Sequence, residues 1–271
     1  MSKERAVLVT GTSGQIGNAL VNHLLKNSDL FIVGLDLQKS TIENERFEFH
    51  EGSVLDIDFL KSISEQITNS GRKLAGIVNA FVYPEFNNEP RDAKKLQSEF
   101  PSIPITTIEL LNAWSQYPAD EAVKSFTLNC VGANNVVASQ LYNLLNSGGS
   151  SVVHIASQYG IKVPRQELFQ SSDKFTYKPY AYSTSKAALL ILSEYQASVF
   201  SGTDVRVNCI SPGSIYRGHS ESFVSKVADS TWTKRMMNLS DVVEPIEFLL
   251  SEGSRYMNGA NLIVDGGWSR T

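Results

Sequence analysis

"AVLVTGTSGQIG", residues 6–17, joins a short apolar run to a turn that contains three glycines. The run itself is a predicted strand, and the residues after the turn place apolar side chains at helical spacing. Gly11, Gly14 and Gly17 permit a tight turn and let backbone amides approach a ligand closely. The N-terminus of the following helix favours a pyrophosphate group. Such a turn can also be a plain strand–helix connection, but its place directly after the first strand favours a dinucleotide site.

Short apolar runs alternate with longer runs of helical period along the chain. Predicted strands cover residues 6–10, 30–36, 46–51, 74–80, 151–157, 205–211 and 261–267. Most are continuously apolar, as expected where helices cover both faces of a parallel sheet. Helical periodicity is clearest in residues 16–28, 131–148 and 183–200. The sequence therefore predicts an α/β fold: a Rossmann-type, doubly wound parallel sheet of about seven strands with helices on both faces. We expect residues 1–271 to form a single domain.

Asp36 ends the second predicted strand, 19 residues after Gly17. A carboxylate there can accept hydrogen bonds from the adenosine ribose of a dinucleotide, and its charge would repel a 2′-phosphate. No arginine lies at positions 35–38, and Lys39 is the nearest cation. The alternative is a solvated aspartate at a strand end. Asp36 therefore favours NAD over NADP as the cofactor.

The stretch "YKPYAYSTSK", residues 177–186, contains three of the ten tyrosines. A phenol has an ordinary pKa of about 10, and a fixed cation beside it favours the phenolate. Residues i and i+4 share one face of a helix. Of the ten tyrosines, only Tyr182 has a lysine at i+4, namely Lys186. Taken alone, the pair could be an exposed aromatic beside a solvated lysine.

With the glycine-rich turn, Asp36 and the Tyr182–Lys186 pair in this order, the chain resembles the short-chain dehydrogenase/reductase family over nearly its whole length. Further matching segments are "VNA" (78–80), "LNCVG" (128–132), "VVHIAS" (152–157), "RVNCISPGSI" (206–215) and "NGANLIVDGG" (258–267). The resemblance implies an oxidoreductase that interconverts a secondary alcohol and a ketone by hydride transfer with a nicotinamide cofactor.

The same resemblance implies a catalytic set of Asn129, Ser157, Tyr182 and Lys186. Tyr182 is the expected general acid/base, and Lys186 would lower its pKa and bind the nicotinamide ribose. Ser157 would donate a hydrogen bond to the reacting oxygen of the substrate. Asn129 matches the family residue that holds a water for proton relay. Asn129 could instead be a helix-interior residue that binds backbone.

Cofactor-binding positions also follow from the resemblance: Gly11, Ser13, Gly14, Gln15, Ile16, Gly17, Asp36, Leu37, Ser53, Val54, Asn79, Ala80, Phe81, Tyr182, Lys186, Pro212, Gly213 and Ile215. Three of them depart from the family pattern. Gln15 stands at the position where the family usually has its middle glycine, and Gly14 precedes it. The resulting Gly-x-x-Gly-x-x-Gly spacing is commoner in the branch of the family that handles sugar nucleotides. Phe81 stands where glycine is usual, and Ser53 replaces an aspartate that often contacts adenine.

Two irregular, polar stretches, residues 83–106 and 162–180, interrupt the alternation of strands and helices, and we expect them to be functional loops. The 25-residue gap from Ser157 to Tyr182 is longer than usual for the family. In these insertions the chain is similar to bacterial dehydrogenases of surface-sugar and flagellin-modification pathways. The candidate substrate residues are Gln158, Tyr159, Arg165, Lys178 and Tyr180; Tyr177 and Tyr180 could instead be packing residues.

The second stretch carries more cations than anions: Lys162, Arg165, Lys174 and Lys178 against Glu167 and Asp173. A local surplus of positive charge attracts anionic substrates. We therefore expect a polar or anionic sugar-type substrate, such as a sugar phosphate or nucleotide sugar. The alternative is a solvated loop with incidental lysines.

Composition narrows the remaining possibilities. The net charge of −4 and the lack of a basic stripe argue against nucleic-acid binding. No apolar run approaches the about 18 residues that span a bilayer, and no signal peptide is visible. Two cysteines, Cys130 and Cys209, fit a reduced cytoplasmic compartment and small core residues. His154 is predicted to be a core histidine inside a strand. The histidines show no metal-binding spacing, so no metal is expected.

Two other functions stay open at this stage. One is an acyl-carrier-protein or small-ketone reductase, which would more naturally use NADPH. The other is a dinucleotide-binding homologue that lacks catalysis, although such a protein would not need Ser157, Tyr182 and Lys186 together. Members of the family that the chain resembles are usually dimers or tetramers, so we expect a homodimer or homotetramer.

Overall fold

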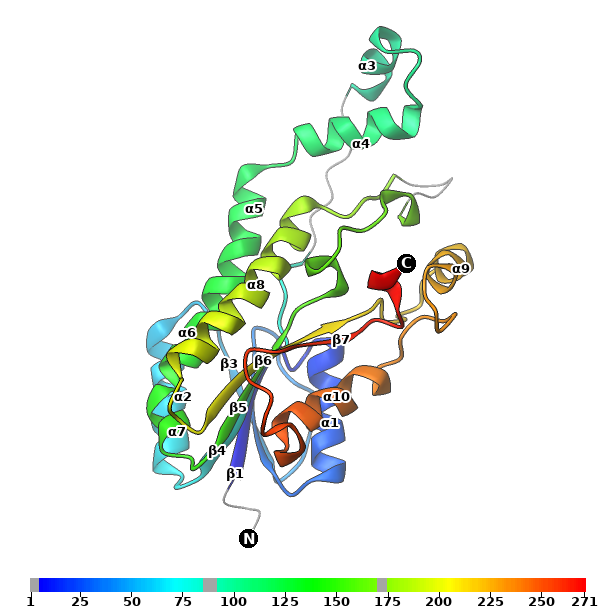
Figure 1. The fold of residues 1–271 in the computed structure, drawn as a ribbon. Coiled ribbons are helices and arrows are strands. Elements are labelled where there is room, and N and C mark those ends of the chain that lie inside the picture. The colour runs from blue at the N-terminus through cyan, green and yellow to red at the C-terminus, as the bar shows by residue number, and fades with distance from the viewer. Residues whose placement is uncertain (1–4, 85–91, 170–174) are drawn as a thin grey trace.

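The computed structural model describes residues 5–84, 92–169 and 175–271. Within these ranges, one parallel sheet of seven strands has the order β3-β2-β1-β4-β5-β6-β7 (Figure 1). The strands are β1 (Arg5–Thr10), β2 (Phe31–Asp36), β3 (Phe47–Glu51), β4 (Lys73–Asn79), β5 (Ser150–Ile155), β6 (Val205–Pro212) and β7 (Asn261–Val264). All seven predicted strands are present, and the doubly wound α/β prediction is confirmed.

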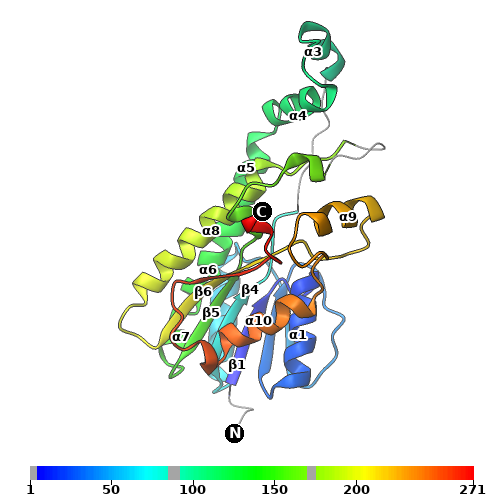
Figure 2. The same ribbon diagram turned by 45° about the vertical axis from the view of Figure 1, so that its right-hand side comes forward.

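Helices cover both faces of the sheet (Figures 1 and 2). One face packs against α1 (Gln15–Asn27) and α10 (Ser240–Leu250), whose buried side chains meet those of β1 and β4. The other packs against α2 (Ile57–Asn69), α6 (Ala133–Ser139), α7 (Leu141–Leu145) and α8 (Tyr180–Val199). The remaining helices are α3 (Ala93–Glu99), α4 (Ile105–Ser115), α5 (Ala119–Phe126) and α9 (Glu221–Asp229). None of the helices described is long and apolar enough to cross a membrane.

The structure differs most from the sequence-based elements at three places. The stretch 83–106 contains α3, because "AKKLQSE" consists mostly of good helix formers. In Figure 1, α3 and α4 extend away from the sheet. The predicted helix 131–148 is divided, since Gln140 leaves helical geometry at φ −97° and ψ 9°. The last strand ends at Val264 rather than at residue 267, because Gly266 and Gly267 both have positive φ.

A chain of buried polar side chains crosses the sheet. Thr10 Oγ1 donates to Asn79 Oδ1 at 3.0 Å, and Asn79 Nδ2 lies 3.1 Å from His154 Nδ1. On the other side of the ring, His154 Nε2 lies 2.8 Å from Gln196 Oε1. This arrangement fits a neutral imidazole that accepts at Nδ1 and donates at Nε2. Burial lowers the pKa of His154 to about 4. The prediction of a satisfied core histidine is therefore confirmed.

His154 should make the fold sensitive to acid. Its pKa is about 4 in the folded protein and 6.5 without the fold, so the unfolded chain binds a proton first as the pH falls. Between pH 6.5 and 4 this residue should remove about 3 kcal/mol from the free energy of unfolding. Denaturant titrations across this window should show a flatter pH dependence for His154→Gln, even if that variant is less stable at pH 7. Equal slopes for the two proteins would contradict the assignment.

Candidate active site

The glycine-rich turn leaves no room for side chains at two of its glycines. Gly11 has φ 78°, and a Cβ there would lie 2.6 Å from the Phe81 amide nitrogen. A Cβ on Gly17 would overlap the carbonyl oxygen of Gly11. Helix α1 starts at Gln15 without a side-chain cap and without an acidic residue in its first turn. Exposed helix-terminal amides in a cradle that a Cβ would fill suit a pyrophosphate, so the residues fit a dinucleotide.

Asp36 is held beside this turn by two backbone amides. Its Oδ2 accepts from Ser13 N at 2.9 Å, and its Oδ1 accepts from Gln38 N at 3.0 Å. Ser13 Oγ in turn donates to Gln38 O at 2.6 Å. A carboxylate oxygen can accept more than one hydrogen bond, so both oxygens keep capacity for a ligand hydroxyl. The end of β2 thus presents a fixed negative charge next to the turn.

The other predicted cofactor positions differ in how they are used. The Asn79 side chain is 2% exposed and bonded within the sheet, so only its backbone can serve a ligand. Phe81 packs against the core cluster that contains Val54. A Cβ on Gly132 would meet Val54 at 2.8 Å and Phe81 at 3.5 Å, so this glycine makes space for the phenylalanine. Ser53 Oγ accepts from Leu55 N at 3.1 Å.

The remaining positions of this group lie along the same edge. Leu37 is 64% exposed directly after Asp36. Ser13, Gly14, Gln15 and Ile16 form the turn and the start of α1, and Ala80 follows β4. After β6, Gly213 N donates to Val264 O at 2.8 Å, and Ile215 forms a parallel bridge with Met237. These bonds fix the segment that starts at Pro212.

Tyr182 and Lys186 both lie in α8, which starts at Tyr180, as their spacing predicts. Lys186 is 3% exposed, and its Nζ donates to Ile155 O at 2.7 Å. Burial lowers the pKa of Lys186 to about 8. Tyr180 is instead 42% exposed and contacts Tyr117 edge-on at 5.2 Å, whereas Tyr177 is buried. Of the three tyrosines in residues 177–186, only Tyr182 therefore lies one helical turn from the buried lysine.

Ser157 lies two residues beyond the carbonyl that binds Lys186. Its Oγ accepts from Tyr159 N at 3.1 Å and caps a short 3₁₀ turn, Gln158–Gly160. A Cβ on Gly160 would lie 2.8 Å from the backbone carbon of Lys186. Only a glycine therefore lets this turn pack against α8 so closely. The contact holds the Ser157 segment against the helix of Tyr182 and Lys186.

Asn129 lies in a π-helical segment, Thr127–Gly132, between α5 and α6. Its Oδ1 accepts from Tyr83 N at 2.9 Å, and its Nδ2 donates to Ser185 Oγ at 3.0 Å. Cys130 Sγ, from the same segment, donates to Ser185 O at 3.4 Å. Asn129 therefore joins the segment after β4 to α8. π-Helical turns are frequent at functional sites.

The positively charged residues of the loop before α8 lie in different environments. Lys178 is buried at 9% exposure, and its Nζ lies 3.8 Å from the centroid of the Tyr182 ring. Arg165 is exposed, and Lys162 donates to the carbonyl oxygen of Thr271. Lys174 and Asp173 lie outside the described residues. Of the three loop cations that the structure describes, Lys178 is the one that lies against Tyr182.

Two aromatic residues that pack against Tyr159, Phe169 and Trp268, were not predicted from the sequence. Tyr159, a predicted substrate residue, contacts Tyr182 at 6.5 Å between ring centroids, Phe169 at 6.0 Å and Trp268 at 5.2 Å. The predicted residue Gln158 donates through Nε2 to Ser214 Oγ at 3.1 Å. Phe169 also contacts Phe223 of α9 at 6.0 Å. Trp268 follows the Gly266–Gly267 turn, but no local pattern places it beside Tyr159.

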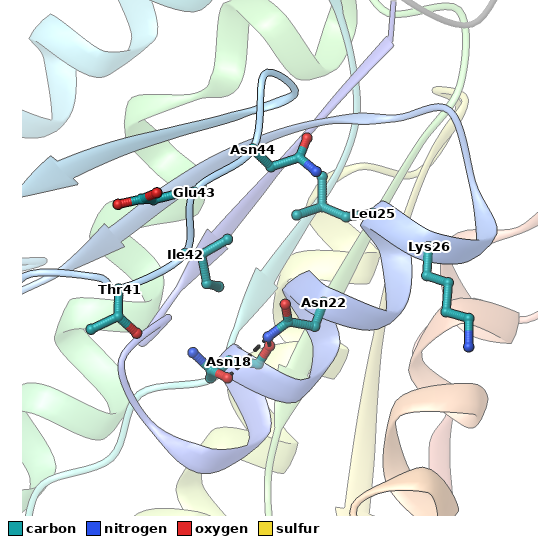
Figure 3. A pocket seen from close by; sticks show the side chains of 8 residues that line it. All are labelled: Asn18, Asn22, Leu25, Lys26, Thr41, Ile42, Glu43 and Asn44. Atoms are coloured by element: carbon teal, nitrogen blue, oxygen red, sulfur yellow. Dashed lines mark hydrogen bonds between the residues drawn. The ribbon is translucent and has the colours of Figure 1, made fainter.

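A cavity of about 450 Å³ lies elsewhere, between the outer side of α1 and the segment after β2 (Figure 3). It is lined by Asn18, Asn22, Leu25, Lys26, Thr41, Ile42, Glu43 and Asn44. No predicted site residue lines it. In the described ranges, no group of three or more His, Cys, Asp and Glu side chains could hold a metal ion.

Comparison with known proteins shows the family to which the chain belongs. A family model described as enoyl-(acyl carrier protein) reductase matches residues 105–269, more than half of the chain. A model of the NAD dependent epimerase/dehydratase family matches residues 7–84, which contain the glycine-rich turn. The chain belongs to the short-chain dehydrogenase/reductase family of oxidoreductases.

Relatives cover almost the entire chain at low identity. Post-translational flagellin modification protein A of Campylobacter coli is 25% identical over 279 residues, with 99% of both chains covered. NADH-dependent L-xylulose reductase of Ambrosiozyma monospora is 25% identical, covering 97% of this chain and 94% of that protein. Another relative is named as an NADPH-dependent aldehyde reductase-like protein. A short chain dehydrogenase from Leptospira borgpetersenii with bound NAD+ superposes with TM-score 0.82 at 24% identity, covering 99% and 94% of the two chains.

The contact at Gly160 can be tested. Gly160→Ala should push the Ser157 turn away from α8, because the new methyl group would collide with the Lys186 backbone. A displacement of about 1 Å at a reacting group can lower turnover about 100-fold. We expect kcat to fall by at least about tenfold while calorimetry shows unchanged dinucleotide affinity.

Gly202→Ala is the control. Gly202 has φ 80° and no atom within 4 Å of its added Cβ, so this variant should lose stability but keep turnover. Wild-type kcat in Gly160→Ala would show that the close approach is not needed.

Proposed function

We propose that this protein is an NAD-dependent oxidoreductase that interconverts a secondary alcohol and a ketone on a polar or anionic sugar-type substrate. One observation carries the proposal. The buried ammonium of Lys186 donates a hydrogen bond to Ile155 O. Lys186 lies one helical turn after Tyr182, and Ile155 lies two residues before Ser157. Family membership supports the same reaction class. The retained set of three side chains also favours an enzyme over a non-catalytic dinucleotide-binding homologue.

In this proposal Tyr182 exchanges a proton with the reacting oxygen of the substrate. Lys186 lies one turn along the helix, and its positive charge favours the phenolate form of Tyr182. The Ser157 hydroxyl donates a hydrogen bond to the same oxygen and stabilises negative charge that develops there. Asn129 fixes the position of α8 through Ser185 and is the proposed holder of a relay water. When bound, the nicotinamide ring supplies or accepts the hydride.

The cofactor preference rests on Asp36. Its carboxylate, fixed by Ser13 N and Gln38 N, can accept hydrogen bonds from ribose hydroxyls and would repel a 2′-phosphate. The relatives include proteins named for NADH and for NADPH, so the chain's own charge decides the proposal. NAD is the proposed cofactor. An acyl-carrier-protein or small-ketone reductase that uses NADPH is the alternative that Asp36 opposes.

The substrate class rests on the surroundings of Tyr182. A buried lysine and the aromatic ring of Tyr159 lie near its phenol, and Trp268 packs against Tyr159. Aromatic faces and a cation suit a ring-shaped substrate with hydroxyl and anionic groups, such as a sugar phosphate or nucleotide sugar. The full-length similarity to a flagellin modification protein and to an L-xylulose reductase supports this choice.

We further propose that the chain is one domain and works in the cytoplasm as a homodimer or homotetramer. Helices α5 and α8 lie side by side and present apolar residues that are more than half exposed: Val123, Ile191, Tyr195 and Val199. Exposed apolar patches of this kind mark protein–protein contacts. This face is the proposed contact between copies of the chain.

The Asp36 proposal makes a quantitative prediction. NAD(H) should bind at least about tenfold more tightly than NADP(H), which corresponds to about 1.4 kcal/mol. Asp36→Ala should narrow that difference by admitting the 2′-phosphate, whereas Asp29→Ala, at a solvated site before β2, should leave it unchanged. Calorimetric titration of both dinucleotides measures the effect. Equal wild-type affinities would refute the preference.

Tyr182→Phe tests the acid/base assignment. Removing this hydroxyl should lower turnover at least about 100-fold, because general acid–base catalysis is worth that much, while NAD binding stays nearly intact. Tyr180→Phe and Tyr177→Phe remove the same atom from neighbouring residues and should keep most activity. Steady-state assays with sugar-type alcohols and NAD measure all three. A Tyr180→Phe variant that loses activity while Tyr182→Phe keeps it would overturn the assignment.

A further inference from the structure

Lys178 is fixed in place by its backbone. Its amide nitrogen donates to Gln166 Oε1 at 2.9 Å, and its carbonyl oxygen accepts from Gln166 Nε2 at 3.1 Å. One side-chain amide thus binds both polar groups of the Lys178 backbone. Pro179 follows, which restricts φ directly before α8 begins at Tyr180. Contacts within the loop therefore fix the backbone of Lys178 in one position.

The ammonium group of Lys178 lies over two phenol rings. Its Nζ is 3.8 Å from the centroid of Tyr182 and 5.3 Å from the centroid of Tyr159. The two rings meet at 6.5 Å with an interplanar angle of 72°. A cation within about 6 Å of a ring centroid is attracted to the ring face, and desolvation strengthens the attraction. Lys178 is 9% exposed, so this interaction is largely shielded from water.

We propose that Lys178 is a second positioning residue for proton transfer, which holds the Tyr182 ring and favours its phenolate form together with Lys186. The inference rests on the proposed role of Tyr182 as the acid/base. Lys178 comes from the lengthened loop between Ser157 and Tyr182, whereas Lys186 comes from α8 itself. The phenol therefore lies near two cations from different elements.

The groups around the pair explain why a second cation matters. Lys178 lies over the ring of Tyr182, Lys186 lies one helical turn along α8, and Tyr159 faces the ring from the 3₁₀ turn. Cys130 and Cys209 face Lys186, and burial raises the pKa of both thiols. Burial lowers the pKa of Lys186 to about 8, so its charge weakens as the pH rises toward that value. A second ammonium keeps a positive field at the phenol.

The test compares Lys178→Met, which keeps a long apolar side chain, with Lys178→Arg, which keeps the cation. The pKa of Tyr182 is read from tyrosinate absorbance in the near ultraviolet, as the difference between each protein and its Tyr182→Phe derivative. Lys178→Met should raise this pKa by about one unit or more, because a unit charge a few ångströms away acts strongly in a shielded site. Lys178→Arg should restore the wild-type value to within about half a unit.

Arg165→Met is the matched control, because Arg165 is an exposed cation of the same loop. It should leave the pKa of Tyr182 unchanged. The limb of the pH profile of kcat/KM that reports Tyr182 should move by the same amount as the absorbance titration. If Lys178→Met does not fold, Lys178→Gln replaces it and should give the same shift.

An unchanged pKa of Tyr182 in the folded Lys178 variants would overturn the proposal, as would an equal shift in Arg165→Met. The two proposals fail separately. Absence of hydride transfer by the wild type from any sugar-type alcohol would refute the proposed function. The absorbance titration needs no substrate and would still decide whether Lys178 acts on Tyr182.

Discussion

The bond from Lys186 to the Ile155 carbonyl determines how the proposed catalytic end of the molecule is built. A buried ammonium without a partner would be costly, and the bond joins α8 to the end of β5, where backbone carbonyls run out of strand partners. The glycine at position 160 lets the following turn lie on the same part of the helix. One interaction thus fixes a helix, a strand end and the serine beyond it, and burial also brings the pKa of the lysine down to about 8.

At the glycine-rich turn, the close packing of backbone segments fixes the structure in a similar way. The turn after β1 packs its own backbone at Gly11 and Gly17, so helix α1 can begin close to the ends of β1 and β4. Asp36 then adds a fixed charge whose oxygens are held by amides of that turn and of its own loop. A dinucleotide bound there, as proposed, would meet backbone donors on one side and a carboxylate on the other, and the protein holds both groups in place.

The sequence predicts those features that depend on local pattern, and it misses those that depend on tertiary contact. The seven strands, Asp36 and the Tyr182–Lys186 spacing are local, because strand polarity and helical period can be counted along the chain. The loop before α8 was expected to act through a surplus of cations, yet the fold buries Lys178 and leaves Arg165 in solvent. That separation depends on Gln166, which binds the Lys178 backbone from 12 residues away, and on the Tyr159 ring. Neither contact can be predicted from a periodic pattern in the sequence. Trp268 reaches Tyr159 from the 3₁₀ turn after β7, a segment that only the order of strands in the sheet brings near.

The polar chain through Asn79 and His154 bears on how the strands find their partners. In the final pairing Thr10 lies opposite Asn79 and Asn79 lies opposite His154, and Gln196 Nε2 extends the chain to Asn134 Oδ1 at 3.2 Å. Apolar strands that are buried on both faces could slide past one another with little loss of hydrophobic contact. A slip of one residue here would leave several polar groups buried without partners. The histidine and its amides therefore act as a check on register, and they give a long-range parallel sheet, otherwise slow to assemble, one alignment that is clearly better than its neighbours.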